Sequence, residues 1–250
     1  YAWEQYDISG TLLGVYASVI DKTSGAVFQS ATLIDATAIN PRCLAIGPNP
    51  TLFYLDTSSS PYVMKSVQVN TLNPVVFNST TTIVSTVNTT NPFYDVAVNS
   101  SNATSGNAAF VYNSSSSTTI GVGFITTDGV AGTPGNGFTG VTTIGSTDAA
   151  DLLTLTVDQV NTAPTETDRL YVGYASTTAG QGLKIKRIKS VLTVEATHTV
   201  EATTTKIDGC SLLVTQAGDL QIVYTLNATN TYDHQVKGAS YDVTADTMGS

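Results

Sequence analysis

Apolar and polar residues alternate in short runs along this chain, and clusters of serine, threonine, asparagine and glycine separate the runs. The clearest example is residues 110–129, FVYNSSSSTTIGVGFITTDG, where two β-branched and aromatic runs flank a polar turn. Such alternation predicts two strands joined by a hairpin. The same outline recurs at 52–69 and 170–190, more weakly at 220–240, and again at 2–20. The hairpin is therefore one copy of a repeat.

A short apolar run precedes each full copy, and a run rich in threonine and valine follows the copies at 52–69 and 170–190. The apolar runs are CLAIG (43–47), YDVAV (94–98), LLTLTV (152–157) and CSLLVT (210–215). The repeating unit is thus four strands in roughly 50 to 60 residues, slightly longer than common propeller repeats. Four such strands are the layout of a β-propeller blade.

We predict an all-β fold, with residues 1–250 forming a single β-propeller region of four-stranded antiparallel blades, about 4.5 of them visible. The expected blades are 1–40 (partial), 41–90, 91–148, 149–206 and 207–250 (partial). The chain is expected to open in the second strand of a blade, to end just after a third strand, and to be part of a longer polypeptide. Stacked β-sandwiches and a β-solenoid stay open as alternatives, although the repeat length suits neither.

Composition narrows the classes of function. Charged residues make up 12% of the 250 residues, about half the usual share, and the net charge is −9. An acidic surface disfavours general nucleic-acid binding. No run approaches the ~20 apolar residues of a membrane helix, so no membrane insertion is expected. The two cysteines, Cys43 and Cys210, are expected to be buried free thiols, with one long-range disulfide as the alternative.

Residues that could carry catalysis or bind a metal are few, and we expect no catalytic site, no metal and no cofactor. His198 is expected on the solvent face of an outer strand and His234 in a turn or at the start of a strand. Neither belongs to a zinc-type motif, and no G-x-S-x-G elbow occurs. The acids Asp148, Asp151 and Asp158 lack the spacing of a calcium loop and are interpreted as solvated. The glycine-rich segment 128–140 lacks the lysine of a phosphate-binding loop.

Four of the ten basic residues fall in LKIKRIKS, at Lys184, Lys186, Arg187 and Lys189. On a strand, Lys184 and Lys186 share one face and Arg187 and Lys189 the other. The simpler interpretation is a third strand with a solvated face that discourages edge pairing. The functional interpretation is a contact to phosphate or to an acidic neighbouring subunit.

The opening segment YAWEQYDISGTLLGVYASV (1–19) and the unit that begins YDVAVNSS (94–101) resemble propeller repeats of structural proteins from tailed bacteriophages. The resemblance is strongest to the tail-nozzle family, also called tail tubular protein B. It implies a virion tail protein that forms a homo-oligomeric ring with other virion subunits, through which the genome passes. It supplies no catalytic residues.

The first functional hypothesis is therefore a non-catalytic virion structural protein that makes rigid subunit or receptor contacts. The second is an adhesin on a virion or extracellular surface, whose propeller binds a host receptor or glycan through Tyr62 and Phe138. Aromatic rings at these turns would stack on sugars. The third and weakest is a glycoside-cleaving enzyme, because the arginines Arg42, Arg169 and Arg187 are not expected to converge in an active site.

Overall fold

A computed structural model describes most of the chain. It covers residues 1–46, 49–70, 76–98, 108–115, 119–125, 142–143, 150–158, 170–176, 182–188, 194–202, 206–227 and 234–249. These residues form strands and turns, and all of the strand pairs are antiparallel. The predicted all-β class is therefore confirmed.

The strands make five sheets, and each sheet uses one continuous stretch of the chain. The first sheet contains β1 (Ala2–Tyr6), β2 (Leu12–Ile20) and β3 (Val27–Asp35). The second contains β4 (Ala38–Ile46), β5 (Asn49–Asp56), β6 (Tyr62–Asn70), β7 (Val76–Phe77) and β8 (Thr81–Val87). The third contains β9 (Tyr94–Val98), β10 (Ala108–Asn113), β11 (Ile120–Ile125) and β12 (Thr142–Thr143). The fourth contains β13 (Ala150–Val157), β14 (Leu170–Ser176), β15 (Leu183–Ile188) and β16 (Val194–Glu201). The fifth contains β17 (Lys206–Val214), β18 (Leu220–Asn227), β19 (His234–Asp242) and β20 (Thr247–Gly249).

Each sheet is a meander in which consecutive strands pair, except that β7 and β8 both pair with β6. The predicted four-strand antiparallel unit is present in the third, fourth and fifth sheets. The sheets span 2–35, 38–87, 94–143, 150–201 and 206–249.

The two ends of the chain differ from the prediction. The loops 7–11 and 215–219 have the same hydrogen bonds: the amide of the first residue donates to the carbonyl of the last, at 2.9 and 2.8 Å, and Gly10 and Gly218 each donate back to the first residue at 3.0 Å. Both glycines have positive φ, 83° and 92°, which these tight loops require. The hairpin β1–β2 is thus the counterpart of β17–β18. The first sheet begins with its first strand, not its second, and the chain ends in a fourth strand, not a third.

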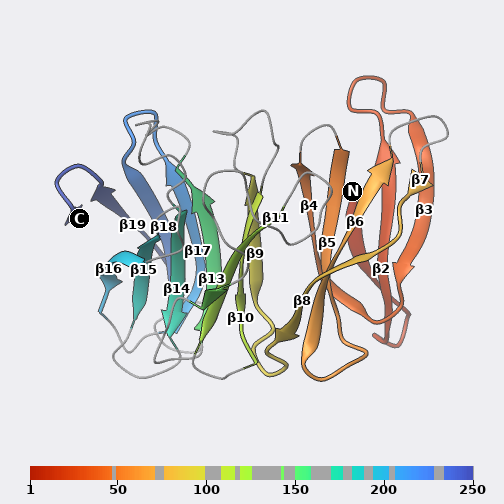
Figure 1. The fold of residues 1–250 in the computed structure, drawn as a ribbon, viewed down its shortest axis with the longest axis horizontal. Helices are drawn as coiled ribbons and strands as arrows, with labels where there is room; N and C mark the ends of the chain where they lie inside the picture. Colours follow the sequence, from red (N-terminus) through yellow and green to blue (C-terminus); the bar gives the residue numbers. More distant parts are fainter. Residues whose placement is uncertain are drawn as a thin grey trace.

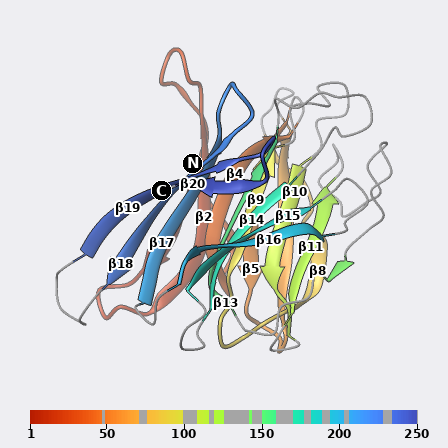
Figure 2. The ribbon, with the colours of Figure 1, turned by 90° about the vertical axis from the view of Figure 1, so that its left-hand side faces the viewer.

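The sheets lie in a row along the longest axis of the molecule, with the first sheet at one end and the fifth at the other (Figure 1). The first strands of successive sheets contact one another: β1 contacts β4, β4 contacts β9, β9 contacts β13 and β13 contacts β17. In Figure 2, which looks along the row, the fifth sheet lies in front and leans to one side of the third and fourth. The arrangement is consistent with a β-propeller-like fold, but the row is not closed into a ring.

A hydrophobic core lies at each boundary between successive sheets. Adjacent residues on one strand point to opposite faces of the sheet and therefore pack in different cores. On β5, Tyr54 packs toward the first sheet and Phe53 toward the third. On β14, Val172 belongs to the core shared with the third sheet and Tyr171 to the core shared with the fifth. Because both faces of the inner sheets are covered, successive residues of their second strands are buried, as all six residues of β10 are. By contrast, β18 alternates between buried and exposed positions for most of its length.

Two glycines of the third sheet make room for aromatic rings on the adjacent strand. Phe110 pairs with Gly123 and Tyr112 with Gly121. A Cβ at Gly123 would lie 2.6 Å from the Phe110 ring, and one at Gly121 would meet the Tyr112 ring even more closely. The glycines in IGVGF are therefore required by cross-strand packing, because each ring occupies the space of the missing side chain.

Candidate functional site

Polar side chains link successive sheets at every boundary of the row, and we call these contacts the inter-sheet ties. At the first boundary, between the first and second sheets, the Lys65 ammonium on β6 lies 3.7 Å from the carboxylate of Asp35, at the end of β3. It also lies 2.6 Å from the carboxylate of Asp56, which belongs to its own sheet. The Thr37 hydroxyl donates to Asp56 at 2.8 Å. Burial acts to raise the pKa of Asp56, but hydrogen bonds from Lys65, Ser58 and Thr37 outweigh it and hold the pKa well below its usual value.

The second boundary is tied through the backbone of Asn40 on β4. Its carbonyl accepts a hydrogen bond from the Tyr94 hydroxyl on β9, and its amide donates to the Glu4 carboxylate on β1 at 2.6 Å. Burial raises the pKa of Tyr94, so its hydroxyl stays protonated and remains a donor. Three successive sheets are joined through one residue, which has a φ of 54°.

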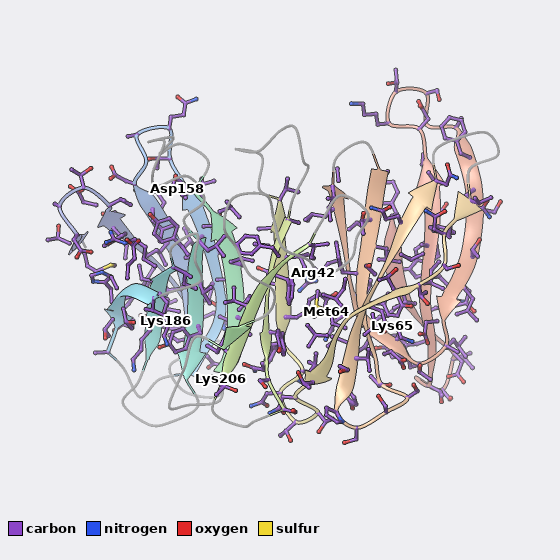
Figure 3. The ribbon with its side chains drawn as sticks, in the orientation of Figure 1. Arg42, Met64, Lys65, Asp158, Lys186 and Lys206 are labelled. Carbon is purple, nitrogen blue, oxygen red and sulfur yellow. The ribbon has the colours of Figure 1, made fainter. Side chains whose placement is uncertain are left out.

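At the third boundary, a carboxylate from one sheet accepts hydrogen bonds from the backbone of the next. Asp95 on β9 accepts from the Leu155 amide on β13 at 2.9 Å and from the Val96 amide at 2.9 Å. Burial raises the pKa of Asp95 despite these hydrogen bonds and the nearby charge of Arg42. Figure 3 shows Arg42 near the middle of the row, between the second and third sheets.

The fourth boundary contains the densest cluster of polar groups, centred on Arg187 of β15. Its Nη1 donates to the Tyr241 hydroxyl on β19 at 2.6 Å, and its Nε lies 3.1 Å from the Glu195 carboxylate on β16. Asp246, in the turn after β19, lies 3.5 Å from the guanidinium and accepts a hydrogen bond from Tyr241. His198 completes the cluster, with its Nε2 3.1 Å from Asp246.

The Arg187 cluster carries two carboxylates for one guanidinium. The hydrogen bond from Tyr241, then the charges of Arg187 and His198, lower the pKa of Asp246. A phosphate would have to displace Glu195 or Asp246 to reach the guanidinium. The cluster is therefore built to join two sheets, and the proposed contact to phosphate or to another subunit stays a prediction.

The two described lysines of the basic segment lie on the opposite face of β15 from Arg187. Lys186 is only 6% exposed, and its ammonium lies 5.6 Å from the centre of the Tyr174 ring. Burial and the neighbouring charge of Lys184 lower the pKa of Lys186. The predicted solvated face is wrong, because the third sheet covers this side of β15 and the fifth covers the other. Figure 3 shows Lys186 within the packed sheets; Lys189 lies outside the described residues.

A further tie of the fourth boundary borders a cavity of about 430 Å³ between β16 and β19–β20. The Glu201 carboxylate accepts hydrogen bonds from the Tyr224 hydroxyl at 2.8 Å and from the Lys237 ammonium at 2.9 Å. These two hydrogen bonds, that of Lys237 first, lower the pKa of Glu201. Burial, followed by the hydrogen bond to Glu201, raises the pKa of Tyr224 to about 12.

Of the two aromatic candidates for glycan binding, Tyr62 is described and Phe138 lies outside the described residues. Tyr62 begins β6, is half-buried, and packs against the core between the second and third sheets. A cavity of about 270 Å³ lies at the same end of the sheets, and Ser60, Pro61, Asn88, Thr89, Thr90 and Ser115 line it. The lining carries the hydroxyl and amide groups that bind sugar hydroxyls, although Tyr62 itself is not part of it.

Both cysteines are free, but one of them is not buried as predicted. Cys43 on β4 is exposed and lines a cavity of about 160 Å³ between the first and second sheets. Cys210 on β17 is partly buried and packs against the core of the fourth boundary. Desolvation by the surrounding residues raises the pKa of both thiols, and that of Cys210, which is the more buried, reaches about 12.

Two further residues, His198 and Asp158, were predicted to face solvent but pack against other residues. His198 packs against the Tyr241 ring, with 4.7 Å between ring centres, and its side chain is only 19% exposed. Asp158 is buried and accepts a hydrogen bond from Tyr171 at 3.4 Å. The side chains of Asp148 and Asp151 lie outside the described part. Within that part, no group of three or more His, Cys, Asp or Glu residues is placed to hold a metal ion, and no helix is long and apolar enough to span a membrane.

Sequence reasoning missed the residues that form most of the ties, among them Asp95, Tyr241 and Asp246. Asp95 gave one usable signal, since an acidic residue inside the apolar run YDVAV must find partners when it is buried. Asp246 gave none, because two of its partners, Arg187 and His198, come from strands more than 40 residues away.

Comparisons with known proteins do not assign the chain to a family. No family model matches it, and no curated protein matches it. A solved structure described as a crystal structure of an ACO/RPE65 chimera aligns with a TM-score of 0.42 and 10% sequence identity, over 94% of this chain and 56% of that one. The chain thus corresponds to little more than half of that protein's length. A likeness this distant identifies neither the fold family nor the function of the chain.

Proposed function

We propose that this chain is a propeller-type domain of a virion structural protein, in a bacteriophage tail component similar to the nozzle. Its role is mechanical: it holds a rigid shape and makes contacts with other subunits or with a receptor, and it performs no reaction. A propeller closes into a ring, so in this proposal the row is completed by sheets of the same kind, which another copy of the chain can supply.

The observation that supports the proposal most is where the polar groups lie. In the described residues, Lys65, Asp95 and Arg187 each connect one sheet to the next, at 3.7 Å to Asp35, 2.9 Å to Leu155 and 2.6 Å to Tyr241. Groups held in this way resist relative movement of the sheets, and none of the three is left poised for proton transfer to a substrate. The resemblance of residues 1–19 to phage tail repeats supports a bacteriophage tail as the particle to which the chain belongs.

The test is to purify the virus particles whose genome encodes this chain and to identify their proteins by mass spectrometry. We expect peptides of this chain in stoichiometric amounts, and an electron-microscopy reconstruction should place it in a symmetric ring on the tail. Its absence from intact particles would reject the proposal. Turnover of a fluorogenic glycoside by the pure chain would reject the non-catalytic part.

One observation favours a second candidate, a glycan-binding adhesin on a virion or extracellular surface. The cavity lined by Ser60, Asn88 and Thr90 offers hydroxyl and amide partners for sugar hydroxyls next to Tyr62. A glycan array probed with the pure chain tests it. We expect binding that is lost in Thr90→Val and kept in Thr82→Val, a change on β8 outside the cavity. An array without signal would reject this candidate.

A further inference from the structure

The large hydrophobic residues exposed in the described part gather at the two ends of the row of sheets. Fourteen such residues are exposed; eight fall within residues 1–35 and three lie in the fifth sheet. The three sheets between them account for the other three, Val76, Phe93 and Val194. Apolar surface that gathers in this way marks an interaction site more often than scattered residues do.

The uncovered face of the fifth sheet is apolar and lacks charge at its centre. Leu213, Val223 and Val236 come from three adjacent strands and are 65%, 50% and 71% exposed. Their cross-strand neighbours on this face include Gln221, Ser211 and Thr225. The residues between them, such as Ile222, point the other way and form the core with the fourth sheet.

The uncovered face of the first sheet has a matching row. Trp3, Tyr16 and Leu33 lie side by side across β1, β2 and β3. The Trp3 and Tyr16 rings are stacked, with centres 6.3 Å apart, and Leu33 is 45% exposed. Val15 and Ala17, on the opposite face of β2, pack against the second sheet.

We call the face of a sheet that points toward the next sheet in the sequence its forward face, and the face that points toward the preceding sheet its backward face. Every interface within the row joins the forward face of one sheet to the backward face of the next. The face with Val223 is the forward face of the fifth sheet, and the face with Tyr16 is the backward face of the first. We infer that these two faces bind each other between copies of this chain, so that the first sheet of one copy packs head to tail on the fifth sheet of another. The inference rests on the proposed function, since it names the surface through which the subunits would meet.

The size of these faces predicts a weak interface. The strands of the first sheet have 5, 9 and 9 residues and those of the fifth 9, 8, 9 and 3. At about 3.3 Å per residue and about 4.8 Å between strands, the two faces cover roughly 360 and 460 Å². The total of roughly 800 Å² lies in the range of weak, transient complexes. Association should therefore depend on concentration, and it gives a closed ring or an open filament according to the rotation between copies.

Sedimentation velocity of the pure chain, from low micromolar to about 1 mM, tests the inference, because weak interfaces assemble in this range. Leu33→Arg blocks the first sheet and Val223→Arg blocks the fifth, while Val223→Thr is the conservative control. We expect the wild type and Val223→Thr to associate. Each arginine variant alone should stay monomeric, and an equimolar mixture of the two should form a dimer, because one unblocked face of each kind remains.

Only a head-to-tail interface gives this complementation. Association of an arginine variant with itself would show a different interface, and a monomeric wild type or a monomeric mixture would overturn the inference. Circular dichroism and thermal melting confirm that the variants are folded. A monomeric chain that is nonetheless found in virions leaves the proposed function intact, and an associating chain absent from virions rejects only that function.

Discussion

The carboxylate of Asp95 on β9 accepts a hydrogen bond from the backbone amide of Leu155 on β13, at 2.9 Å. This bond joins the third sheet to the fourth at their first strands. A side chain that binds the backbone of another sheet fixes its position more firmly than apolar packing, which is non-directional. The relationship makes Asp95 a test of whether the ties hold the sheets in place.

Asp95→Ala should lower the free energy of unfolding by about 1–3 kcal/mol, because the Leu155 amide loses its acceptor in a buried place. Asp95→Asn keeps an acceptor oxygen and should cost less at pH 7. Denaturation in urea measures both. Equal stability of the wild type and Asp95→Ala would show that the bond does not contribute.

Asp95 also predicts a pH dependence. Burial raises its pKa above the ordinary 3.8, so the folded protein holds this proton more tightly than the unfolded chain does. The contribution of Asp95 to stability is therefore present below 3.8 and is lost as the pH rises through the raised pKa. The stability of the wild type relative to Asp95→Asn should fall over that interval. A difference that stays constant with pH would contradict the raised pKa.

Lys65→Met should destabilise the protein by about 3 kcal/mol, because it leaves the largely buried Asp56 carboxylate without its cation. The matched control is Lys206→Met: its ammonium lies 3.1 Å from Asp208, but the Lys206 side chain is 67% exposed (Figure 3). An exposed pair of this kind contributes about 1 kcal/mol or less. Equal effects of the two changes, measured by urea denaturation at pH 7, would contradict the buried tie.

Asp56 predicts the opposite pH dependence from Asp95. Its pKa in the folded protein lies well below 3.8, so its contribution to stability is present above 3.8 and is lost as the pH falls below that value. Lys65→Met should reduce the stability that the protein loses as the pH falls below 3.8. Unfolding curves between pH 2 and 5, the range in which carboxylates of this kind titrate, provide the measurement.

Gly123→Ala should destabilise the third sheet by about 1–3 kcal/mol, because the new methyl group overlaps the Phe110 ring and forces it to move. Gly238→Ala on β19 is the control, since the nearest atom to its added Cβ lies 3.8 Å away. Thermal melting compares the two variants. A Gly123→Ala protein as stable as the control would mean that the ring relaxes without cost.

Thiol labelling should distinguish the two cysteines. Cys43 is exposed, whereas Cys210 is partly buried and its pKa is raised to about 12, so we expect Cys43 to react at least about tenfold faster near pH 8. Cys43→Ser and Cys210→Ser assign the two rates, and the unfolded protein should label both equally. Faster reaction at Cys210 would contradict its position on β17.

The sequence predicted the strands better than their surroundings. Alternation and turn residues located the hairpin of β10 and β11 around SSSS, since strand period and turn chemistry are local properties. The same alternation gave the wrong environment for Lys186 and Arg187, because period two separates the faces of a strand but does not tell whether a second sheet covers each face.

The inter-sheet ties were beyond sequence reasoning for a related reason. Arg187 meets Tyr241 only because two sheets, each complete in itself, pack at one particular rotation. No local propensity encodes that rotation. The position of Cys43 depends in the same way on how closely the first sheet approaches the second.

Among the described residues, the extensive contacts between sheets connect only sheets that follow one another in the sequence. A pulling force applied to the two ends of the chain would therefore pass through the junctions in series, and the weakest junction would yield first. We expect a single-molecule pulling experiment to show stepwise extension, with one step for each sheet that detaches. A module with this response dissipates a sudden load gradually instead of failing at once.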